Sequence, residues 1–115
     1  MKYMLLMYST ESDPRTTPEA FKVAAKAWQA YKMELESSGV VVSHDVLSSV
    51  TNATTVRIRD DKTLTTDGPF AETHEQLGGY YLIECKDLDE AISWAAKIPT
   101  AKYGSIEVRP EWSQK

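Results

Sequence analysis

The chain is poor in cysteine, has no excess of basic charge and lacks a long apolar run. Cys85 is its one cysteine, so no disulfide can form within the chain. A chain of 115 residues without such cross-links is typical of a reducing compartment. The apolar run at the start, Tyr3 to Tyr8, is too short for a membrane span or a signal core, and no small-residue cleavage site follows it. We therefore expect a soluble, cytoplasmic protein that does not bind a membrane.

The charge balance argues against nucleic-acid binding. The 17 Asp and Glu outnumber the 13 Lys and Arg, which gives a net charge of −4, whereas phosphate binding depends on a basic face. Two histidines and one cysteine form no spacing typical of a metal site, so we expect no metal. A composition of 42% hydrophobic and 26% charged residues is ordinary for a globular chain. The prediction is one domain, residues 1–115, with a buried core.

Periodicity predicts six strands and two helices. The expected strands span Met1–Tyr8, Val40–Leu47, Thr54–Arg59, Thr63–Thr66, Gly79–Cys85 and Ser105–Arg109. The first helix has Thr17 as its N-cap, Pro18 in its first turn and Gly39 at its end. Its apolar stripe consists of Phe21, Ala24, Trp28, Tyr31 and Leu35.

The second helix begins after Asp87, which forms a capping box with Glu90, and it ends before Pro99. Its predicted apolar stripe consists of Leu88, Ala91, Ile92, Ala95 and Ile98. Without the hairpin, the order is β-α-β-β-α-β, the ferredoxin-like arrangement of an α+β protein.

The two strands that this arrangement places at the centre of the sheet are apolar on both faces. Two helices cover only one face of a four-stranded sheet. The other face would leave aromatic and aliphatic side chains in water, more than monomers usually expose. We therefore expect a homodimer in which a second copy covers that face, sheet against sheet.

Four segments carry a resemblance to a known family. They are "TDGPFAETHEQLGGYYLIE", "TTVRIRD", "DLDEAISWAAKIP" and "IEVRP", and the likeness spans Met1 to Pro110. The chain resembles the DGPF branch of the YCII-related proteins. This resemblance implies a dimeric α/β barrel with a ferredoxin-like protomer. It also implies a family whose members are mostly uncharacterised, for some of which enzymatic activity has been suggested, and some of which are encoded beside extracytoplasmic sigma factors.

The chain departs from that family at two places. His74 stands where the family usually has lysine, so the role of this cation would vary with pH. The wider YCII group has a proposed His–Asp pair, with the histidine near the start of the first helix. Asp67 matches the aspartate, but the segment "TPEAFKVAAKAW" contains no histidine.

The turn Asp67-Gly68-Pro69-Phe70 has two interpretations. In the first, Asp67 acts as a general base or as an anchor for a ligand. In the second, Asp67 only hydrogen-bonds to the backbone of the turn, and Phe70 fills the core. If the preceding hairpin turn has three residues, Asp60-Asp61-Lys62, then Arg57 lies diagonally from Asp67 on the same face. Arg57 and Asp67 would then either hold a small anion together or form only a half-exposed ion pair. A slip of one residue would place them on opposite faces.

The loop that follows is rich in ionisable groups. The imidazole of His74 can give and take a proton at neutral pH, and Glu75 is its neighbour; the alternative is a solvated loop. Gly78 and Gly79 allow close approach of a ligand or of a neighbouring strand. "LGGYY" precedes a strand, so it is not a dinucleotide fingerprint, and no organic cofactor is expected.

Three further residues complete the candidates. Arg109 alternates with core residues on the last strand, as Glu107 does, and it points away from the helices toward a pocket or the dimer interface. His44 is expected to share a strand face with Val40, Val42 and Val46, as a satisfied core or edge residue. Cys85 is expected to be a small buried hydrophobe.

Three hypotheses follow from these residues, and one of them is that the protein is a purely structural dimer. In the first, the protein binds a small polar or anionic molecule and acts as an enzyme without a cofactor, with Asp67 and His74 as acid–base groups. The ligand contacts would come from Arg57, Glu75, Gly78, Gly79 and Arg109. The alternative is an accessory protein of sigma factor-dependent transcription, which acts through contact with a partner protein.

Overall fold

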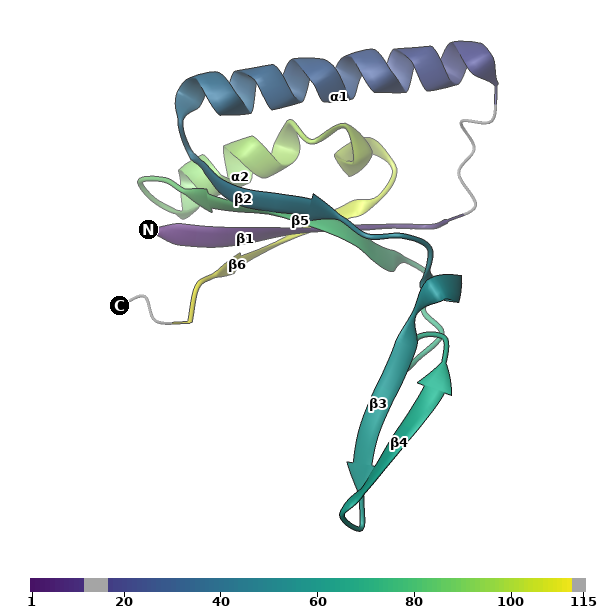
Figure 1. Cartoon of the computed structure of the whole chain (residues 1–115). Helices are drawn as coiled ribbons and strands as arrows, with labels where there is room; N and C mark the ends of the chain where they lie inside the picture. The colour runs from purple at the N-terminus through teal and green to yellow at the C-terminus, as the bar shows by residue number, and fades with distance from the viewer. Residues whose placement is uncertain (12–16, 113–115) are drawn as a thin grey trace.

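The computed structural model describes residues 1–11 and 17–112. Its elements are β1 (Lys2–Ser9), α1 (Pro18–Ser38), β2 (Val41–Val46), the 3-10 helix η1 (Val50–Asn52), β3 (Thr54–Arg59), β4 (Lys62–Asp67), β5 (Gln76–Glu84), α2 (Leu88–Ala96), the 3-10 helix η2 (Pro99–Lys102) and β6 (Ser105–Pro110). This order confirms the predicted α+β fold with a ferredoxin-like arrangement and an inserted hairpin (Figure 1).

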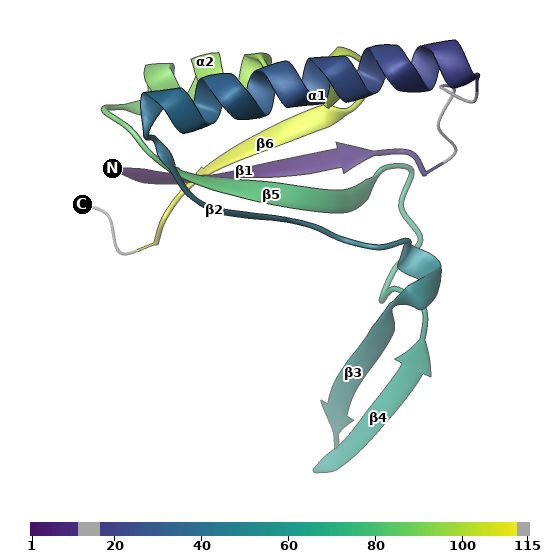
Figure 2. The same cartoon turned by 45° about the horizontal axis from the view of Figure 1, so that its top comes forward.

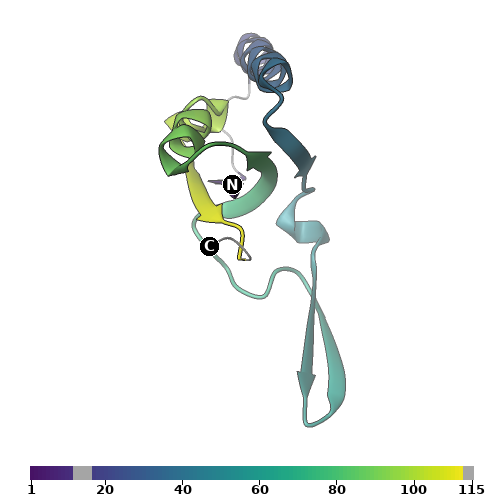
Figure 3. The same ribbon diagram turned by 90° about the vertical axis from the view of Figure 1, so that its left-hand side faces the viewer.

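The main sheet is antiparallel and has the strand order β2-β5-β1-β6, so the apolar strands β1 and β5 are central, as predicted. Both helices lie over one face of this sheet, with α2 beside α1 (Figure 2). The β3–β4 hairpin forms a separate two-stranded sheet. It projects from one end of the main sheet, on the side opposite the helices (Figure 3).

Helix α1 begins and ends where its capping residues predict. The side chain of Thr17 accepts a hydrogen bond from the N–H of Ala20, and Gly39 adopts a φ of 75°. Tyr31 and Leu35 are buried, whereas Phe21 is 69% exposed. The predicted stripe is therefore wrong at its first residue, because the buried residues of α1 lie in its C-terminal half and the start of the helix extends beyond the core.

Helix α2 has the predicted capping box. The N–H of Glu90 donates to the Asp87 carboxylate (2.9 Å), and the Glu90 carboxylate accepts from the N–H of Lys86 (3.1 Å). Its predicted stripe is wrong at Leu88 and Ile92, which are 48% and 50% exposed. The buried side chains of this segment are Ala91, Trp94, Ala95 and Ile98. Because Ala91 and Ala95 are small, the face of α2 that carries them can approach the sheet closely.

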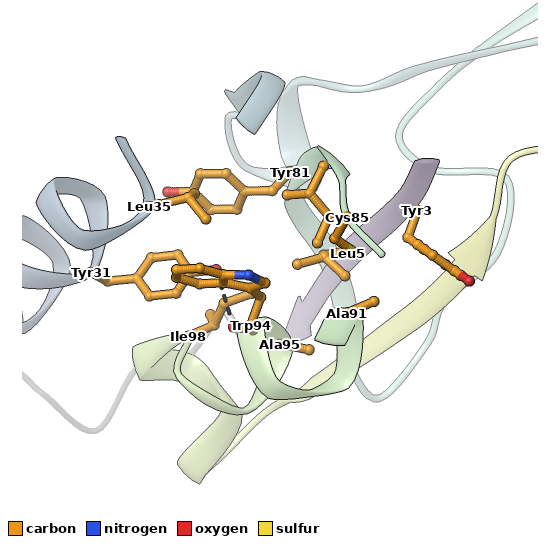
Figure 4. Packing of buried hydrophobic residues seen from close by; sticks show 11 residues of the cluster. Tyr3, Leu5, Tyr31, Leu35, Tyr81, Cys85, Ala91, Trp94, Ala95 and Ile98 are labelled. Carbon is orange, nitrogen blue, oxygen red and sulfur yellow. Dashed lines mark hydrogen bonds between the residues drawn. The ribbon is translucent and has the colours of Figure 1, made fainter. Parts of the chain in front are cut away.

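The core lies between the sheet and the two helices (Figure 4). Leu5 and Ile83 are fully buried between the layers, and the hydroxyl of Tyr31 donates to the carbonyl of Trp94 (3.2 Å). Cys85 is buried, as predicted. Burying this apolar surface supplies the main favourable term for joining the two layers.

The opposite face of the sheet has no helix on it. We call it the open face, and its apolar side chains are Met4, Leu6, Tyr8, Tyr80 and Leu82. Residues paired across strands point to the same side, and Met4 pairs with both Leu82 and Arg109. Arg109 therefore points away from the helices, as predicted. All five apolar side chains are partly exposed in the single chain.

We call the β3–β4 hairpin the arm. Arg59 pairs with Lys62, so its turn consists of Asp60 and Asp61 alone, with φ of 51° and 61°. The predicted three-residue turn is therefore wrong. Two-residue turns with positive φ at both positions match the right-handed twist of paired strands, which favours this register.

Two further predictions about side-chain direction are wrong. Phe70 is 77% exposed, because the turn that contains it lies at the base of the arm, beyond the core. In β2, the register shifts between Val41 and Ser43, so Val41 pairs with Ile83 while His44 pairs with Tyr81. This bulge turns Val41 and not Val42 toward the same face as His44.

Candidate functional site

A cavity of about 630 Å³ lies between α1 and the sheet. We call it the α1–sheet cavity. It is lined from α1, β1, β2, β5 and η2 by Met7, Ser9, Trp28, Gln29, Lys32, His44, Asp45, Val46, Gly78, Tyr81 and Thr100. Its volume is within the range of small-molecule sites. The sequence does not bring these elements together; only the layering of α1 over the sheet does.

Aromatic rings form one wall of this cavity. The imidazole of His44 stacks on Tyr81 with centroids 5.3 Å apart and planes at 29°. Tyr81 in turn contacts Tyr31 edge to face at 5.6 Å, and Tyr31 contacts Trp28 at 6.2 Å. Three of these four rings, those of His44, Tyr81 and Trp28, line the α1–sheet cavity. Such a wall can pack against a flat ligand.

The polar groups of the cavity are few. Lys32 and Gln29 enter from α1, and Lys32 makes no ion pair with any residue in the ranges 1–11 and 17–112. The hydroxyl of Thr100 is buried, and it has no hydrogen-bond partner among the described residues. An unpaired buried hydroxyl costs about 1–3 kcal/mol, so a water or a polar ligand group beside it would stabilise the site.

The carboxylate of Asp45 is directed elsewhere. Asp45 pairs with Tyr80, so its side chain lies on the side of the open face. It accepts a hydrogen bond from the N–H of Val46 (2.9 Å). Apart from the phenol of Tyr81, the ionisable side chains that line the cavity are therefore those of Lys32 and His44.

The two predicted glycines have different roles. Gly78 lines the α1–sheet cavity, and a Cβ there would meet nothing closer than the carbonyl oxygen of Met7 at 3.9 Å. At Gly79 a Cβ would lie 2.7 Å from the carbonyl oxygen of Asp45 and 2.9 Å from Cε of Met7. Gly79 is thus required by the neighbouring strands, and Gly78 leaves room beside the cavity.

The structure does not bring Arg57 and Asp67 together. Arg57 pairs with Leu64 and Asp67 pairs with Thr54, so the two side chains lie on opposite faces of the arm. The predicted diagonal contact is wrong, because the two-residue turn shifts the pairing of β3 with β4 by one residue. Arg57 donates to the carbonyl of Phe70 instead (3.3 Å), and Asp67 is exposed.

The remaining predicted residues lie apart from the cavity. His74 is exposed in the segment between β4 and β5. The carboxylate of Glu75 accepts from the Ser105 hydroxyl (2.8 Å), which connects this segment to β6. Arg109 lies 3.5 Å from Glu107 in an exposed ion pair on the open face. None of the three lines the α1–sheet cavity.

A second cavity, of about 670 Å³, lies on the other side of α1, against α2 and η2. Its wall on α1 is largely alanine, and Lys97 at its edge is paired with Glu34 (2.6 Å) and lies over the ring of Trp94. Lys102 also lines this second cavity, but the stacked rings of His44 and Tyr81 line only the α1–sheet cavity, which is therefore the better candidate for a flat ligand.

Burial raises the pKa values of three side chains, of which that of Tyr81 lines the α1–sheet cavity. Burial, and then the charge of Glu36, raises the pKa of Tyr81. Burial is also the main cause that raises the pKa values of Tyr31 and Cys85 above their ordinary range. These groups are therefore neutral at pH 7. Among residues 1–11 and 17–112, no three His, Cys, Asp or Glu side chains gather as a metal site would require.

Sequence reasoning missed His44 and Lys32 as cavity residues. Alternation placed His44 on the apolar face of its strand, but it gave no sign that a cavity lies between that face and α1. Lys32 follows Tyr31 by one position in α1, so it flanks the apolar stripe. A charged residue beside a buried aromatic on a helix is the signal that could have drawn attention to it.

Three comparisons with known proteins bear on this site. The family model of the YCII-related domain matches residues 1–113. An uncharacterised protein of Rhizobium meliloti (strain 1021) is 41% identical over 105 residues, which are 90% of this chain and 78% of that protein. The structure also resembles that of 5-chloro-2-hydroxyhydroquinone dehydrochlorinase from Burkholderia phenoliruptrix AC1100, in complex with 2,5-dihydroxybenzoquinone.

That likeness has a TM-score of 0.52 and 16% identity, and it covers 100% of this chain and 96% of the other. At this identity it shows a shared fold alone. In the described ranges, no helix is long and apolar enough to span a membrane.

Proposed function

This chain belongs to the YCII-related family, and on that premise we propose that it binds a small planar anion in the α1–sheet cavity and transfers a proton on it. The observation that carries the proposal is the stacked pair His44–Tyr81 on the wall of a cavity that is also lined by Lys32, a residue with no ion pair among residues 1–11 and 17–112. Flat aromatic walls select a planar ligand, and a lysine favours its negative charge.

The chemistry of the two cavity side chains supports acid–base catalysis. The imidazole of histidine donates or accepts a proton at neutral pH. In the proposed reaction, His44 exchanges a proton with a ring hydroxyl or an acidic C–H of the ligand while Lys32 balances the resulting anion. The enzyme of similar fold was solved with 2,5-dihydroxybenzoquinone, a flat ring that carries hydroxyl and carbonyl groups. A ligand of this class suits both the flat wall and the lysine.

This assignment replaces Asp67 and His74 with His44 as the acid–base group. Asp67 and His74 lie outside the cavity lining, whereas His44 is part of it. Their predicted roles require a ligand at the base of the arm. The accessory role in transcription through a sigma-factor partner stays a prediction, and a pull-down from cell extract tests it.

We further propose that the protein is a homodimer in which the open face packs on a second copy. The surface of the single chain is 8365 Å², against about 6,300 Å² for a folded monomer of this size. Its radius of gyration is 16.4 Å, against about 13 Å for a compact domain of this length. The excess area, about 2,000 Å², is in the range that one partner contributes to an obligate dimer.

Isothermal titration tests the ligand proposal, with 2,5-dihydroxybenzoquinone and benzoate as the anionic probes and benzamide as the neutral one. We expect both anions to bind and benzamide to bind more weakly. Lys32→Gln should weaken anion binding about tenfold, a loss of about 1.4 kcal/mol. Lys26→Gln is the matched control, because Lys26 is exposed on the same helix and outside both cavities. Equal losses in the two variants would refute the role of Lys32.

A further inference from the structure

The arm is held firmly at its base and lies free of the body along its length. Thr55 Oγ1 donates to the carbonyl of Gly68 (2.8 Å), and the N–H of Gly68 donates to the carbonyl of Ala53 (2.7 Å). Arg57 adds the bond to Phe70 described above. These bonds tie the turn that follows β4 to the strand that precedes it, so the arm keeps one conformation where it leaves the sheet.

Glu11 fixes the direction of the arm. Its carboxylate accepts hydrogen bonds from the N–H of Val50 (2.9 Å) and the hydroxyl of Ser49 (3.1 Å) at the start of η1, which leads into β3. Its own N–H donates to the side chain of Gln76 at the start of β5 (3.2 Å). Glu11, two positions after the end of β1, thus connects the segment before β3 with the start of β5. These hydrogen bonds therefore fix the direction in which the arm leaves the main sheet.

The two faces of the arm differ in chemistry. One face carries Val56 and Ile58, which are 60% and 64% exposed, and the residues opposite them are threonines. The other face carries Arg57, Arg59 and Lys62 around Leu64. A two-stranded hairpin alone is only marginally stable in water. Exposed apolar strands of this kind are usually covered by another part of the protein or by a partner. The Val56–Ile58 face is therefore the one that needs a partner.

The position of the arm identifies that partner. The arm projects to the side of the sheet that carries the open face (Figures 1 and 3). A second copy that covers the open face would lie beside the arm. Two-fold symmetry makes the contact reciprocal, so each copy would present its own arm to the other. The excess surface of about 2,000 Å² per chain is of the size that one partner contributes to an obligate dimer.

We propose that the arm of each copy packs along the second copy and buries Val56 and Ile58 there. The inference rests on the homodimer proposed above and is independent of the ligand in the α1–sheet cavity. Glu11 is then a positioning residue, which sets the direction in which the arm leaves the body.

Sedimentation equilibrium tests this contact. We expect wild type to be a dimer, and the double variant Val56→Asp, Ile58→Asp to raise its dissociation constant by at least about tenfold, as for a pair of interface anchors. Leu64→Asp is the control: it places one acidic side chain on the other face of the arm and should leave the constant within about threefold of wild type. The single variant Val56→Asp matches it in charge and should raise the constant more than Leu64→Asp does. A second variant replaces residues 55–66 by Asn-Gly, which joins the paired residues Thr54 and Asp67. It should weaken the dimer as the double variant does.

Hydrogen exchange at two protein concentrations provides a measurement on the unaltered chain. Amides of residues 54–67 should exchange more slowly at the concentration that favours the dimer. A dimer whose dissociation constant changes in neither arm variant would overturn the arm contact and leave the open-face dimer standing. A wild-type chain that stays monomeric would overturn both, and ligand titration would still decide the cavity proposal separately.

Discussion

The imidazole of His44 lies on the phenol ring of Tyr81, 5.3 Å from centroid to centroid, at the wall of the α1–sheet cavity. This stack exists because a bulge in β2 pairs His44 with Tyr81 on the side of the sheet that faces the helices. It places a histidine beside a cavity that is also lined by Lys32. The proposed function depends on this pair of rings more than on any other contact.

His44→Ala should weaken the binding of 2,5-dihydroxybenzoquinone by about threefold to tenfold, because the ligand loses one aromatic contact of about 0.5–1.5 kcal/mol. His74→Ala removes the other histidine, which is exposed outside the cavity, and should leave the affinity unchanged. Isothermal titration of both variants measures the difference. If the loss appears in His74→Ala and not in His44→Ala, the ligand binds at the base of the arm and the assignment to the cavity is wrong.

Gly79→Ala should lower the free energy of unfolding by about 1–3 kcal/mol, the usual cost of overpacking. A Cβ there would lie 2.7 Å from the carbonyl oxygen of Asp45, which belongs to the backbone and cannot swing aside. Gly78→Ala is the adjacent control, since its Cβ would have 3.9 Å to the nearest atom. Urea denaturation should show a large loss for the first variant and a change within about 0.5 kcal/mol for the second. Similar losses in both would contradict this account of the two glycines.

The protein should lose stability in alkaline solution. Burial raises the pKa values of Cys85, Tyr31 and Tyr81 in the folded state, whereas the unfolded chain releases these protons near the ordinary values of about 8.5 for cysteine and 10 for tyrosine. The stabilisation is therefore complete below about pH 8.5 and declines as the pH rises above it.

Urea midpoints at pH 7, 9 and 10.5 measure this decline. Cys85→Ala should reduce the decline between pH 7 and 9, and Tyr31→Phe should reduce the further decline at pH 10.5. The slope against pH is the quantity to compare, since Tyr31→Phe also removes the hydrogen bond to Trp94. A midpoint that is constant from pH 7 to 10.5 would show that these groups titrate alike in the folded and unfolded chain.

Asp61→Gly should stabilise the arm by up to about 1 kcal/mol. Asp61 adopts a φ of 61° in the two-residue turn, a conformation that glycine adopts without the steric cost of a side chain. Slower hydrogen exchange at residues 54–67 is the expected observation. Lys62→Gly is the control: Lys62 is the first residue of β4, where glycine weakens a strand, so the arm should exchange faster. Faster exchange in Asp61→Gly would contradict the assigned turn.

The predictions made from local patterns were confirmed at the helix ends. Thr17, Gly39 and Asp87 act through groups within a few residues of themselves, so the sequence contains all of the interaction. The alternation along β1 and β5 likewise determined which residues face the core, because successive residues of a strand point to opposite sides. These patterns were sufficient for the ferredoxin-like order of strands and helices.

The errors occurred where a neighbour distant in sequence decides the outcome. Phe21 and Ile92 fit apolar stripes, yet they are exposed because the helices use only part of each stripe against the sheet. Arg57 and Asp67 were separated by a turn one residue shorter than expected. A shift of one residue in a strand reverses the side of every later side chain, so a small local difference removed a whole proposed site.

Residues close together in the chain were enough to predict the two-layer fold, the caps and the doubly apolar central strands. The cavity that Lys32 of α1 and His44 of β2 share with Tyr81 of β5 follows from the folded arrangement of three elements that are distant in sequence. That arrangement depends on a bulge, on the height at which α1 crosses the sheet and on the packing of side chains between them. Such packing is a property of many distant contacts at once, and no short pattern in the sequence records it.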